Sequence, residues 1–585
     1  MSNQYPIDHP INKEFVAGLL AKHPAFSSSL SAEWLRVANQ QMHKEANLRL
    51  SRIHGRLTLG NTGLFMDSPD YAVTSFCEQK AKSVELDVMD FAARKLREPL
   101  FDYVVKVVEE AGLDFPIDDL EDFEFEEMLA AIKRICEAKW WRKQVRKMQA
   151  REVEAVARDI RLVHSKAGIY CSDFTANRRQ EQRKRNRELL NSIEAVNNAE
   201  GDKYCCATLA ELSDLSVSNP KNRRNELMVR IRGFEELAVQ AKHIGLFLTL
   251  TCPSKFHAFL KAGFPNRKYK GSTPRDAQAY LGKVWARIRA EWDRNGVSPY
   301  GFRVVEPHHD GTPHWHTMLF IEPEKKDLAI SIFQKHALRE DGNERGADKY
   351  RTKVVEIDPS KGTAAGYIAK YISKNIDGHG IDSDLYGRDA KTSAQRIEAW
   401  ASTWGIRQFE QIKGPSVTVW REIRRATEDG LLSEPEDVQK ARKAADLADW
   451  AAFTVLMGGA QVKREDQLLR PLYVENDEPN AYGEITEVLK GLFHSAGKIT
   501  TRIHDWILQR AGTEEKRKNM ADRFTIEDSL THKRMNAQMA VGVPIECVGS
   551  FFKETGTGST WTCVNNCTGR EPPDRASHKS EVSLF

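Results

Sequence analysis

Apolar side chains recur at three- and four-residue spacing through the first third of the chain, with few prolines or glycines between them. This spacing is typical of amphipathic helices, because residues three and four apart share one helix face. The pattern is most regular over residues 83–110 and 127–162, and it continues into a basic segment at 177–189. We expect a mainly helical region over residues 1–235.

A second pattern begins near residue 244, where short β-favouring apolar runs alternate with longer helical segments. Strands are predicted at 244–251, 301–306, 314–321 and 353–357, and helices at 274–294, 325–339 and 363–375. The order β-α-β-β-α-β-α is typical of a ferredoxin-like arrangement, with helices on one face of an antiparallel-containing sheet. We therefore expect an α+β protein whose central domain covers residues 236–376.

Helical spacing returns beyond residue 376, in segments at 430–455, 483–508 and 513–537. It predicts a second mainly helical region over residues 377–550, followed by a flexible tail at 551–585 that is rich in Gly, Ser, Thr and charge. No run approaches the roughly 18–20 apolar residues that cross a membrane, and the first residues lack the apolar core of a secretion signal. We expect no membrane partner and a cytoplasmic location.

Charge is unevenly distributed along the chain, although its sum is close to zero. The 585 residues, too many for one ordinary domain, carry 87 basic and 83 acidic side chains, a net charge of +4. Residues 114–127 contain eight acids and no base, whereas residues 131–190 contain 17 lysines and arginines against seven acids. Such a basic arm indicates a protein that binds a phosphate backbone; a solvated helix face is the common alternative.

One predicted strand carries His314 and His316, with a tryptophan between them. Alternate residues of a strand point to the same face, so both imidazoles share one side of the sheet. The preceding Asp310-Gly311 predicts a tight turn that pairs Glu306 with this stretch. One carboxylate and two imidazoles suit Mg²⁺, Mn²⁺ or Zn²⁺. The alternative is a pair of partly exposed histidines that bind no metal.

Two tyrosines, Tyr367 and Tyr371, lie four residues apart in the last helix predicted for the central domain. Residues at this spacing share a helix face, so the two phenols stand about 6 Å apart. Each is followed three residues later by a lysine, Lys370 and Lys374, whose charge would stabilise a phenolate or a phosphate. The unit of nucleophile and cation thus occurs twice. The alternative is an amphipathic helix whose tyrosines pack and whose lysines reach solvent.

Three segments together resemble the three motifs of the HUH endonucleases, which are rolling-circle replication initiators, relaxases and related transposases. They are a hydrophobic strand (FLTLT, 247–251), a His-hydrophobic-His strand (PHWHTMLF, 313–320) and a tyrosine helix (YIAKYISK, 367–374), in that order. The paired tyrosines resemble the two-tyrosine initiators. Over residues 200–425 the chain is similar to the replication gene A proteins of temperate tailed phages and their prophages.

This resemblance implies a central HUH endonuclease domain in which His314 and His316, with Glu306 as third ligand, hold Mg²⁺ or Mn²⁺. One tyrosine would nick a replication origin, leaving a 5′-phosphotyrosine and a free 3′-OH that primes rolling-circle replication. The second tyrosine would cut the regenerated origin. The implied partners are single-stranded and supercoiled origin DNA and the replication machinery of a bacterial host. A host helicase is expected because the sequence contains no Walker-type nucleotide-binding loop.

Two other classes of function remain open. A metal-dependent hydrolase would use Glu306, His314 and His316 to activate water, so it would nick DNA without a covalent adduct and without either tyrosine. A non-catalytic DNA-binding protein would need only the basic arm, and it would show salt-sensitive binding without cleavage. The spaced tyrosine pair is the feature that separates an endonuclease with a covalent intermediate from both.

Overall fold

The structure is a computed structural model that describes residues 10–60, 62–197, 206–360, 362–380, 382–383, 387–427, 429–503 and 506–512. These residues form an α+β protein that divides into two compact units. Within the described ranges, the first unit comprises residues 10–186 and 227–503, and the second comprises 187–226 and 506–512. The helix predicted at 513–537 and the tail predicted at 551–585 lie outside the described residues.

The N-terminal part of the first unit is helical, as its apolar spacing predicts. Its helices are α1 (Pro10–Lys22), α2 (Ser27–Gln40), α3 (His43–Arg56), α4 (Asp70–Ala93), α5 (Arg97–Glu110), α6 (Phe125–Ile135) and α7 (Ala138–Asp159). Both long predicted helices are interrupted. The first breaks before α5, where Lys95 has a positive φ of 58°, and the second breaks at Glu137, whose backbone is extended. These helices share one apolar core.

A five-stranded sheet forms the centre of the first unit, in the order β6-β3-β5-β4-β7, and each pair of neighbours is antiparallel. The strands are β3 (Ile244–Thr251), β4 (Tyr300–Pro307), β5 (Pro313–Ile321), β6 (Val354–Glu356) and β7 (Phe409–Ile412). The four predicted strands are present. The fifth, β7, was not predicted because its FEQI sequence is short and half polar, and it extends the sheet beyond residue 376.

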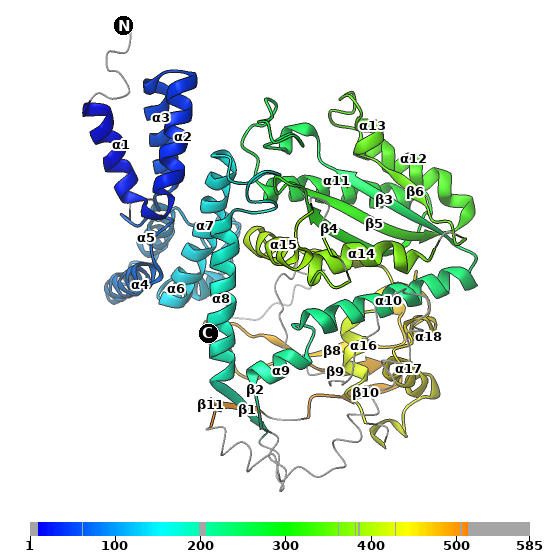
Figure 1. Cartoon of the computed structure of the whole chain (residues 1–585). Helices are drawn as coiled ribbons and strands as arrows, with labels where there is room; N and C mark the ends of the chain where they lie inside the picture. The colour runs from blue at the N-terminus through cyan, green and yellow to red at the C-terminus, as the bar shows by residue number, and fades with distance from the viewer. Residues whose placement is uncertain are drawn as a thin grey trace. The chain divides into compact units, whose positions relative to one another are not determined.

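Helices cover both faces of this sheet (Figure 1), whereas the sequence predicts helices on one face. One face packs against α11 (Pro274–Arg294), α12 (Lys326–Ala337) and α15 (Ala390–Trp404); the other packs against α10 (Pro220–Gln240) and α14 (Ala364–Ile376). The prediction fails because every residue of β4 is buried, so both faces of the sheet need cover. A short helix, α13 (Ala347–Tyr350), precedes β6.

The rest of the first unit mixes helices with a second antiparallel sheet, ordered β10-β9-β8. Its elements are α16 (Val417–Ile423), α17 (Glu436–Asp446), α18 (Trp450–Leu456), β8 (Arg470–Glu475), β9 (Glu487–His494) and β10 (Gly497–Thr500). The helix predicted over 483–508 is therefore wrong. Leu489 and Leu492 have helical spacing, but Gly491 lies so close to the backbone carbonyl of Ile499 that no side chain would fit between the paired strands.

The second unit holds a small sheet, ordered β11-β1-β2. Its elements are β1 (Ile193–Asn197), β2 (Cys206–Thr208), α9 (Leu209–Leu215) and β11 (Trp506–Arg510), together with the end of α8 (Asp173–Asn191) and the start of α10. Short 3-10 helices occur in the first unit, at Pro24–Phe26, Ser254–Phe256, Pro323–Lys325, Asp429–Leu431 and Arg464–Asp466. Among the described residues, no helix is long and apolar enough to span a membrane.

Candidate functional site

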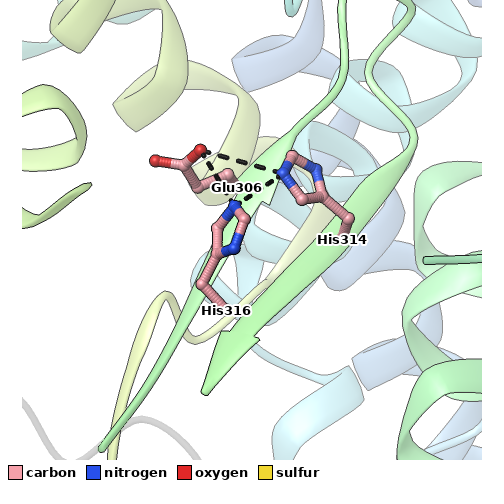
Figure 2. Close-up of side chains that lie close together, drawn as sticks. All are labelled: Glu306, His314 and His316. Carbon is pink, nitrogen blue, oxygen red and sulfur yellow. Dashed lines mark hydrogen bonds and ion pairs between the residues drawn. The ribbon is translucent and has the colours of Figure 1, made fainter. Parts of the chain in front are cut away.

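The strand register brings the predicted metal ligands together. In the β4–β5 hairpin, Glu306 stands directly opposite His314, as the sequence predicts. On the other side of β5, Thr249 of β3 stands opposite His316 and Thr251 stands opposite His314. Figure 2 shows the two imidazoles and the carboxylate turned toward one another on one face of the sheet.

The donor atoms converge closely enough to share one cation. The Nε2 atoms of His314 and His316 are 2.9 Å apart, and Glu306 Oε2 lies 3.8 Å and 3.7 Å from them. All three donors fall within 4.8 Å of one another. Their side chains retain only 12%, 9% and 2% of their accessible surface, in the order His314, His316 and Glu306. Two imidazoles and one carboxylate fit a divalent cation and leave coordination positions for substrate or water.

The protonation states of these groups also suit a metal site. Burial, together with the neighbouring cation and imidazoles, lowers the pKa of His314 well below its usual value, so the ring is neutral. Burial opposes ionisation of Glu306, but Lys374, His316 and Asn375 outweigh it and lower the pKa of Glu306 to about 2. A neutral imidazole and an ionised carboxylate are the forms that bind metals.

The two histidines differ in what holds their second ring nitrogen. The Nδ1 atom of His316 lies 3.2 Å from the Thr249 hydroxyl, which fixes the ring with Nε2 toward Glu306. The Nδ1 atom of His314 is buried and has no hydrogen-bond partner within the described residues. Its ring instead packs on His308, with centroids 4.0 Å apart and planes inclined by 33°. His316 is thus oriented by a hydrogen bond, and His314 by ring packing.

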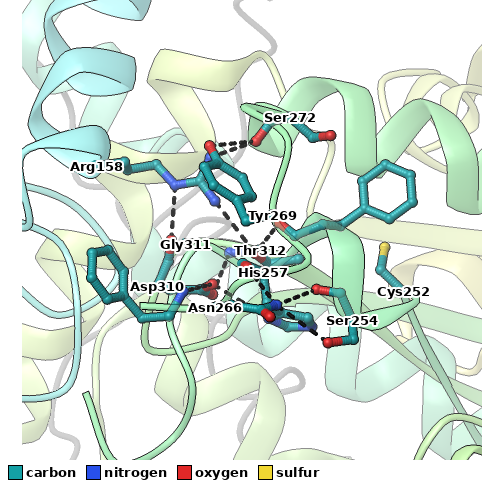
Figure 3. A network of polar contacts seen from close by, with 12 residues as sticks. Arg158, Cys252, Ser254, His257, Asn266, Tyr269, Ser272, Asp310, Gly311 and Thr312 are labelled. Carbon is teal, nitrogen blue, oxygen red and sulfur yellow. Dashed lines mark hydrogen bonds and ion pairs between the residues drawn. The ribbon is translucent and has the colours of Figure 1, made fainter. Parts of the chain in front are cut away.

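A buried polar network holds the turn of the histidine hairpin (Figure 3). Arg158 of α7 donates to the backbone oxygens of Asp310 and Ser272, both at 2.9 Å, and to the Thr312 hydroxyl at 3.4 Å. The Asp310 carboxylate accepts from the Thr312 amide at 3.1 Å and lies 3.4 Å from Nδ1 of His257. Although burial penalises the charge, His257 and Arg158 hold the pKa of Asp310 well below its usual value. Arg158 of α7 thus anchors the turn of the histidine hairpin.

The tyrosines lie on α14, whose first turn is held at two points. The Thr363 hydroxyl caps the helix by accepting from the Gly366 amide at 2.9 Å. The carboxylate of Glu235, on α10, accepts from the amides of Ala364 and Ala365 at 2.5 Å and 3.2 Å. A carboxylate at this position also complements the positive end of the helix dipole. The helix predicted at 363–375 is therefore present, and its start is fixed against α10.

The structure brings Tyr371 against the metal-ligand group. Its ring centroid lies 4.3 Å from that of His316, and both Tyr367 and Tyr371 pack on Phe247, at 4.7 Å and 5.3 Å. Burial, with smaller contributions from the charges of Glu306 and Tyr367, raises the pKa of Tyr371. Both Tyr367 and Tyr371 are half-buried.

The two lysines of the motif occupy different places. Lys370 is exposed, and its Nζ lies 5.3 Å and 5.1 Å from the ring centroids of Tyr367 and Tyr371. Lys374 points toward the sheet, where its Nζ lies 3.2 Å from Glu306 Oε2. One cation therefore stands beside the phenols and the other beside the carboxylate, although the sequence suggests two equivalent units.

Sequence reasoning missed several residues that support this site. Asn375 donates to Glu306 Oε1 and to the Tyr371 carbonyl, the latter at 2.6 Å. Its position four residues after Tyr371 would have placed it on the same helix face. The place of Thr249 beside His316 would follow from the alternation of side chains along β3, but only once the register between β3 and β5 is known. Arg158 has no local signal, because it lies about 150 residues before the hairpin it holds.

The chain is similar in sequence to known phage proteins. It is 38% identical over 450 residues to the replication protein of Haemophilus phage HP1, covering 74% of this chain and 53% of that protein. It is 40% identical over 467 residues to the replication gene A protein of Escherichia phage 186, covering 77% and 61%. It is 35% identical over 398 residues to a probable replication endonuclease from a prophage-like region of Salmonella paratyphi A, covering 64% and 49%.

The chain thus spans between 49% and 61% of the length of these relatives. No significant match was found among solved structures. The family model of the bacteriophage replication gene A protein matches residues 73–379, which is more than half of the chain and includes the whole histidine hairpin and the tyrosine helix. The chain therefore belongs to the family of bacteriophage replication gene A proteins.

Proposed function

We propose that this chain is a site-specific, metal-dependent DNA-nicking endonuclease and strand transferase that initiates rolling-circle replication of phage DNA. The observation that carries the proposal is the packing of Tyr371 on His316, with ring centroids 4.3 Å apart. A candidate nucleophile thus lies in contact with a group of three side chains that could ligate a metal. The name of a relative, a probable replication endonuclease, supports the same class of activity.

The catalytic domain is proposed to be an HUH endonuclease domain of ferredoxin-like fold, flanked by regions that assist it. The antiparallel order β6-β3-β5-β4 supports this assignment, because a β-α-β-β-α-β chain of ferredoxin-like fold has this strand order. The sequence predicts this domain over residues 236–376, and β7 adds a further strand to its sheet from outside that range.

The reaction is a transesterification. The phenolic oxygen of Tyr371 attacks the scissile phosphorus, a bond forms between them, and the bond from phosphorus to the 3′ oxygen breaks. The phenol gives up its proton and the departing 3′ oxygen takes one up. The product is a 5′-phosphotyrosine and a free 3′-OH, which serves as a primer. The bond energy is kept in the covalent link, so no nucleotide triphosphate is consumed.

Each functional side chain has a separate task in this proposal. Glu306, His314 and His316 would hold Mg²⁺ or Mn²⁺, which as a Lewis acid would stabilise the negative charge of the transition state. Lys370, beside both phenols, favours the phenolate electrostatically. Lys374, whose Nζ lies 3.2 Å from Glu306 Oε2, would stabilise the phosphate once a metal ion takes over that carboxylate.

Tyr367 supplies the second nucleophile. It lies one helical turn before Tyr371 and shares the contact with Phe247, so it reaches the same site after a small shift of the strand. When the first tyrosine still carries the 5′ end, Tyr367 can cut the regenerated origin. The released 3′-OH then attacks the first phosphotyrosine and closes a circle. A single tyrosine would have to release its product before a second cut.

The partners that follow are single-stranded and supercoiled origin DNA and the host replication machinery, with a host helicase to unwind the duplex. The reaction would take place in the cytoplasm of the bacterial host. Because the chain spans only part of its relatives, these partners are proposed for the segment that carries the site.

The test is an adduct assay on supercoiled origin DNA with Mg²⁺. The parent protein should form a covalent protein–DNA adduct that survives denaturation, and chelator should abolish it. Tyr371→Phe should remove most of the adduct at the first cut, Tyr367→Phe should block circle closure, and the double variant should form none. Tyr482→Phe serves as a control, since its hydroxyl bonds to Glu137 away from the site.

The outcomes separate the three classes of function. Nicking by the double variant would indicate a hydrolase that activates water at Glu306, His314 and His316. Salt-sensitive DNA binding without any nicking in the parent would indicate a DNA-binding protein without catalysis. Either result would overturn the proposed covalent mechanism.

A further inference from the structure

A stripe of cations runs along one face of α7. Lys143, Lys147 and Arg151 follow one another at four-residue intervals, so they share this face. Arg275, in the first turn of α11, joins the end of the stripe. At Gly405, Arg151 Nη2 and Arg275 Nη1 lie 3.4 Å and 3.9 Å from the point where a side chain would begin. The two guanidinium groups therefore converge on one place.

These cations are close enough to disturb one another. Burial and the charges of Arg151 and Arg275 lower the pKa of Lys147. Burial and the charge of Arg275 likewise lower the pKa of Arg151. The one carboxylate that acts on both groups in the opposite direction is the exposed Asp114. A cluster of like charges costs free energy that a bound anion would recover.

The basic residues of α8 are different, because acids already neutralise several of them. Arg179 and Arg183 lie 2.6 Å and 3.8 Å from carboxylate oxygens of Glu398. Across the part of the chain that the structure describes, neither Lys147 nor Arg275 has a carboxylate within 4.0 Å. The charges of Lys147 on α7 and Arg275 on α11 are therefore available to a bound anion.

The cluster lies on the same helix as Arg158, which holds the turn of the histidine hairpin. Arg151 is held in place by a 3.4 Å hydrogen bond from its Nε to the Thr403 carbonyl. Seven residues later on the same helix, about 10 Å along its axis, Arg158 bonds to the turn of the histidine hairpin. Gly405 has a positive φ of 65° and no side chain, which leaves the space between the two guanidinium groups open.

We propose that Lys147, Arg151 and Arg275 form a binding site for backbone phosphates of a single DNA strand, with Lys143 extending it along α7. The inference rests on the proposed function, since it names the surface that guides DNA toward the tyrosine site. Phosphate contacts of this kind set the position of a strand without reading its sequence.

The test measures binding without cleavage. Fluorescein-labelled oligothymidylate is titrated in chelator with the Tyr367→Phe/Tyr371→Phe protein, over a series of salt concentrations. Adding Lys147→Gln and Arg275→Gln should raise the dissociation constant roughly ten- to thirtyfold near 0.1 M salt and reduce the slope of log affinity against log salt by about 1.4. Asp114→Asn should strengthen binding, a gain that misfolding cannot produce.

Lys283→Gln/Arg287→Gln is the matched control, because both side chains are exposed on α11 at the same four-residue spacing. It should bind oligothymidylate like the parent. The proposal is overturned if the test pair binds as tightly as the parent, or if the control pair loses as much affinity. The adduct assay tests the nuclease mechanism separately. If Lys147→Gln and Arg275→Gln weaken binding but the parent protein never forms an adduct, the phosphate site is supported and the endonuclease proposal is refuted.

Discussion

The two halves of the proposed catalytic site are held to very different degrees. The turn of the histidine hairpin has three successive backbone carbonyls, those of His309, Asp310 and Gly311, and each accepts a hydrogen bond from a different segment of the chain. Their donors are the amide of Tyr170 at 3.3 Å, Arg158 at 2.9 Å and the indole of Trp400 at 2.8 Å. The hairpin is thus fixed from three directions.

The tyrosine helix packs into the core through Ile368 and Ile372, and its polar contacts with other segments lie at its ends. Glu235 and the Thr363 cap hold its first turn, and Lys374 and Asn375 contact Glu306 near its last turn. Between these points, Tyr367, Lys370 and Tyr371 form a face that is half-buried or exposed and makes mainly ring contacts. In the proposed mechanism, this difference would keep the metal ligands preorganised and would let the two tyrosines exchange roles.

The largest expected effect concerns the nucleophile. In a Tyr367→Phe protein only Tyr371 can attack, and its raised pKa keeps the phenol protonated through the neutral range. Because the phenolate fraction grows with pH below the pKa, adduct formation should rise about tenfold per pH unit between about pH 6 and pH 9. Rates of adduct formation at saturating Mn²⁺ check this.

The metal ligands provide the internal control for that profile. Glu306 has a pKa of about 2 and His314 a pKa well below its usual value, so neither changes protonation over this range. Protonation of Glu306 and His314 should therefore contribute no change in Mn²⁺ affinity while the rate changes. A rate that levels off below about pH 8 would contradict a protonated Tyr371.

Arg158→Met removes the connection between α7 and the hairpin. It leaves the carbonyls of Asp310 and Ser272 without their donor inside the fold, so we expect a loss of about 2–4 kcal/mol in the free energy of unfolding. Mn²⁺ affinity should fall roughly tenfold or more, because the β4–β5 hairpin carries all three metal-ligating side chains. Urea unfolding and calorimetric titration measure the two effects. Arg142→Met, exposed on the same helix, should change neither; equal behaviour of both variants would show that the hairpin is not anchored by α7.

Thr249→Val tests how the hairpin orients a single ligand. Valine keeps the shape of threonine but removes the hydroxyl that lies 3.2 Å from His316 Nδ1, so Mn²⁺ affinity should fall about tenfold. Thr251→Val is the matched control, since Thr251 stands opposite His314 at the next position of the same strand face. Electron paramagnetic resonance of bound Mn²⁺ gives both affinities. If the two variants lose the same affinity, the hydroxyl has no specific role.

Lys374→Gln tests the contact that joins the two halves. The ammonium group 3.2 Å from Glu306 Oε2 competes with a metal ion for the carboxylate, so its removal should raise Mn²⁺ affinity roughly threefold to tenfold while slowing adduct formation. Lys370→Gln should slow adduct formation without changing Mn²⁺ affinity, because Lys370 lies beside the phenols. The distinction between the lysines would fail if the Lys370 variant bound Mn²⁺ more tightly, or if the Lys374 variant bound it no more tightly than the parent.

The sequence predicts the contacts that local periodicity sets and misses those between distant segments. The Asp310-Gly311 turn and the two-residue period of strands placed Glu306 opposite His314, and the helix period placed both tyrosines on one face. These are local rules. The contacts of Arg158 with the hairpin and of Glu235 with α14 join elements far apart in sequence, so no local pattern contains them. The helix expected over 483–508 failed because apolar spacing around Leu489 fits helix and strand alike.

The central claim is that a tyrosine of α14 beside the Glu306–His314–His316 group becomes linked to DNA. The most direct measurement is mass spectrometry of the adduct after nuclease and protease digestion. The account predicts a peptide spanning residues 367–374 with a 5′-linked nucleotide on Tyr371 after the first cut and on Tyr367 when Tyr371 is occupied. Linkage to a residue outside this helix, or nicked DNA whose 5′ phosphate carries no peptide, would contradict it.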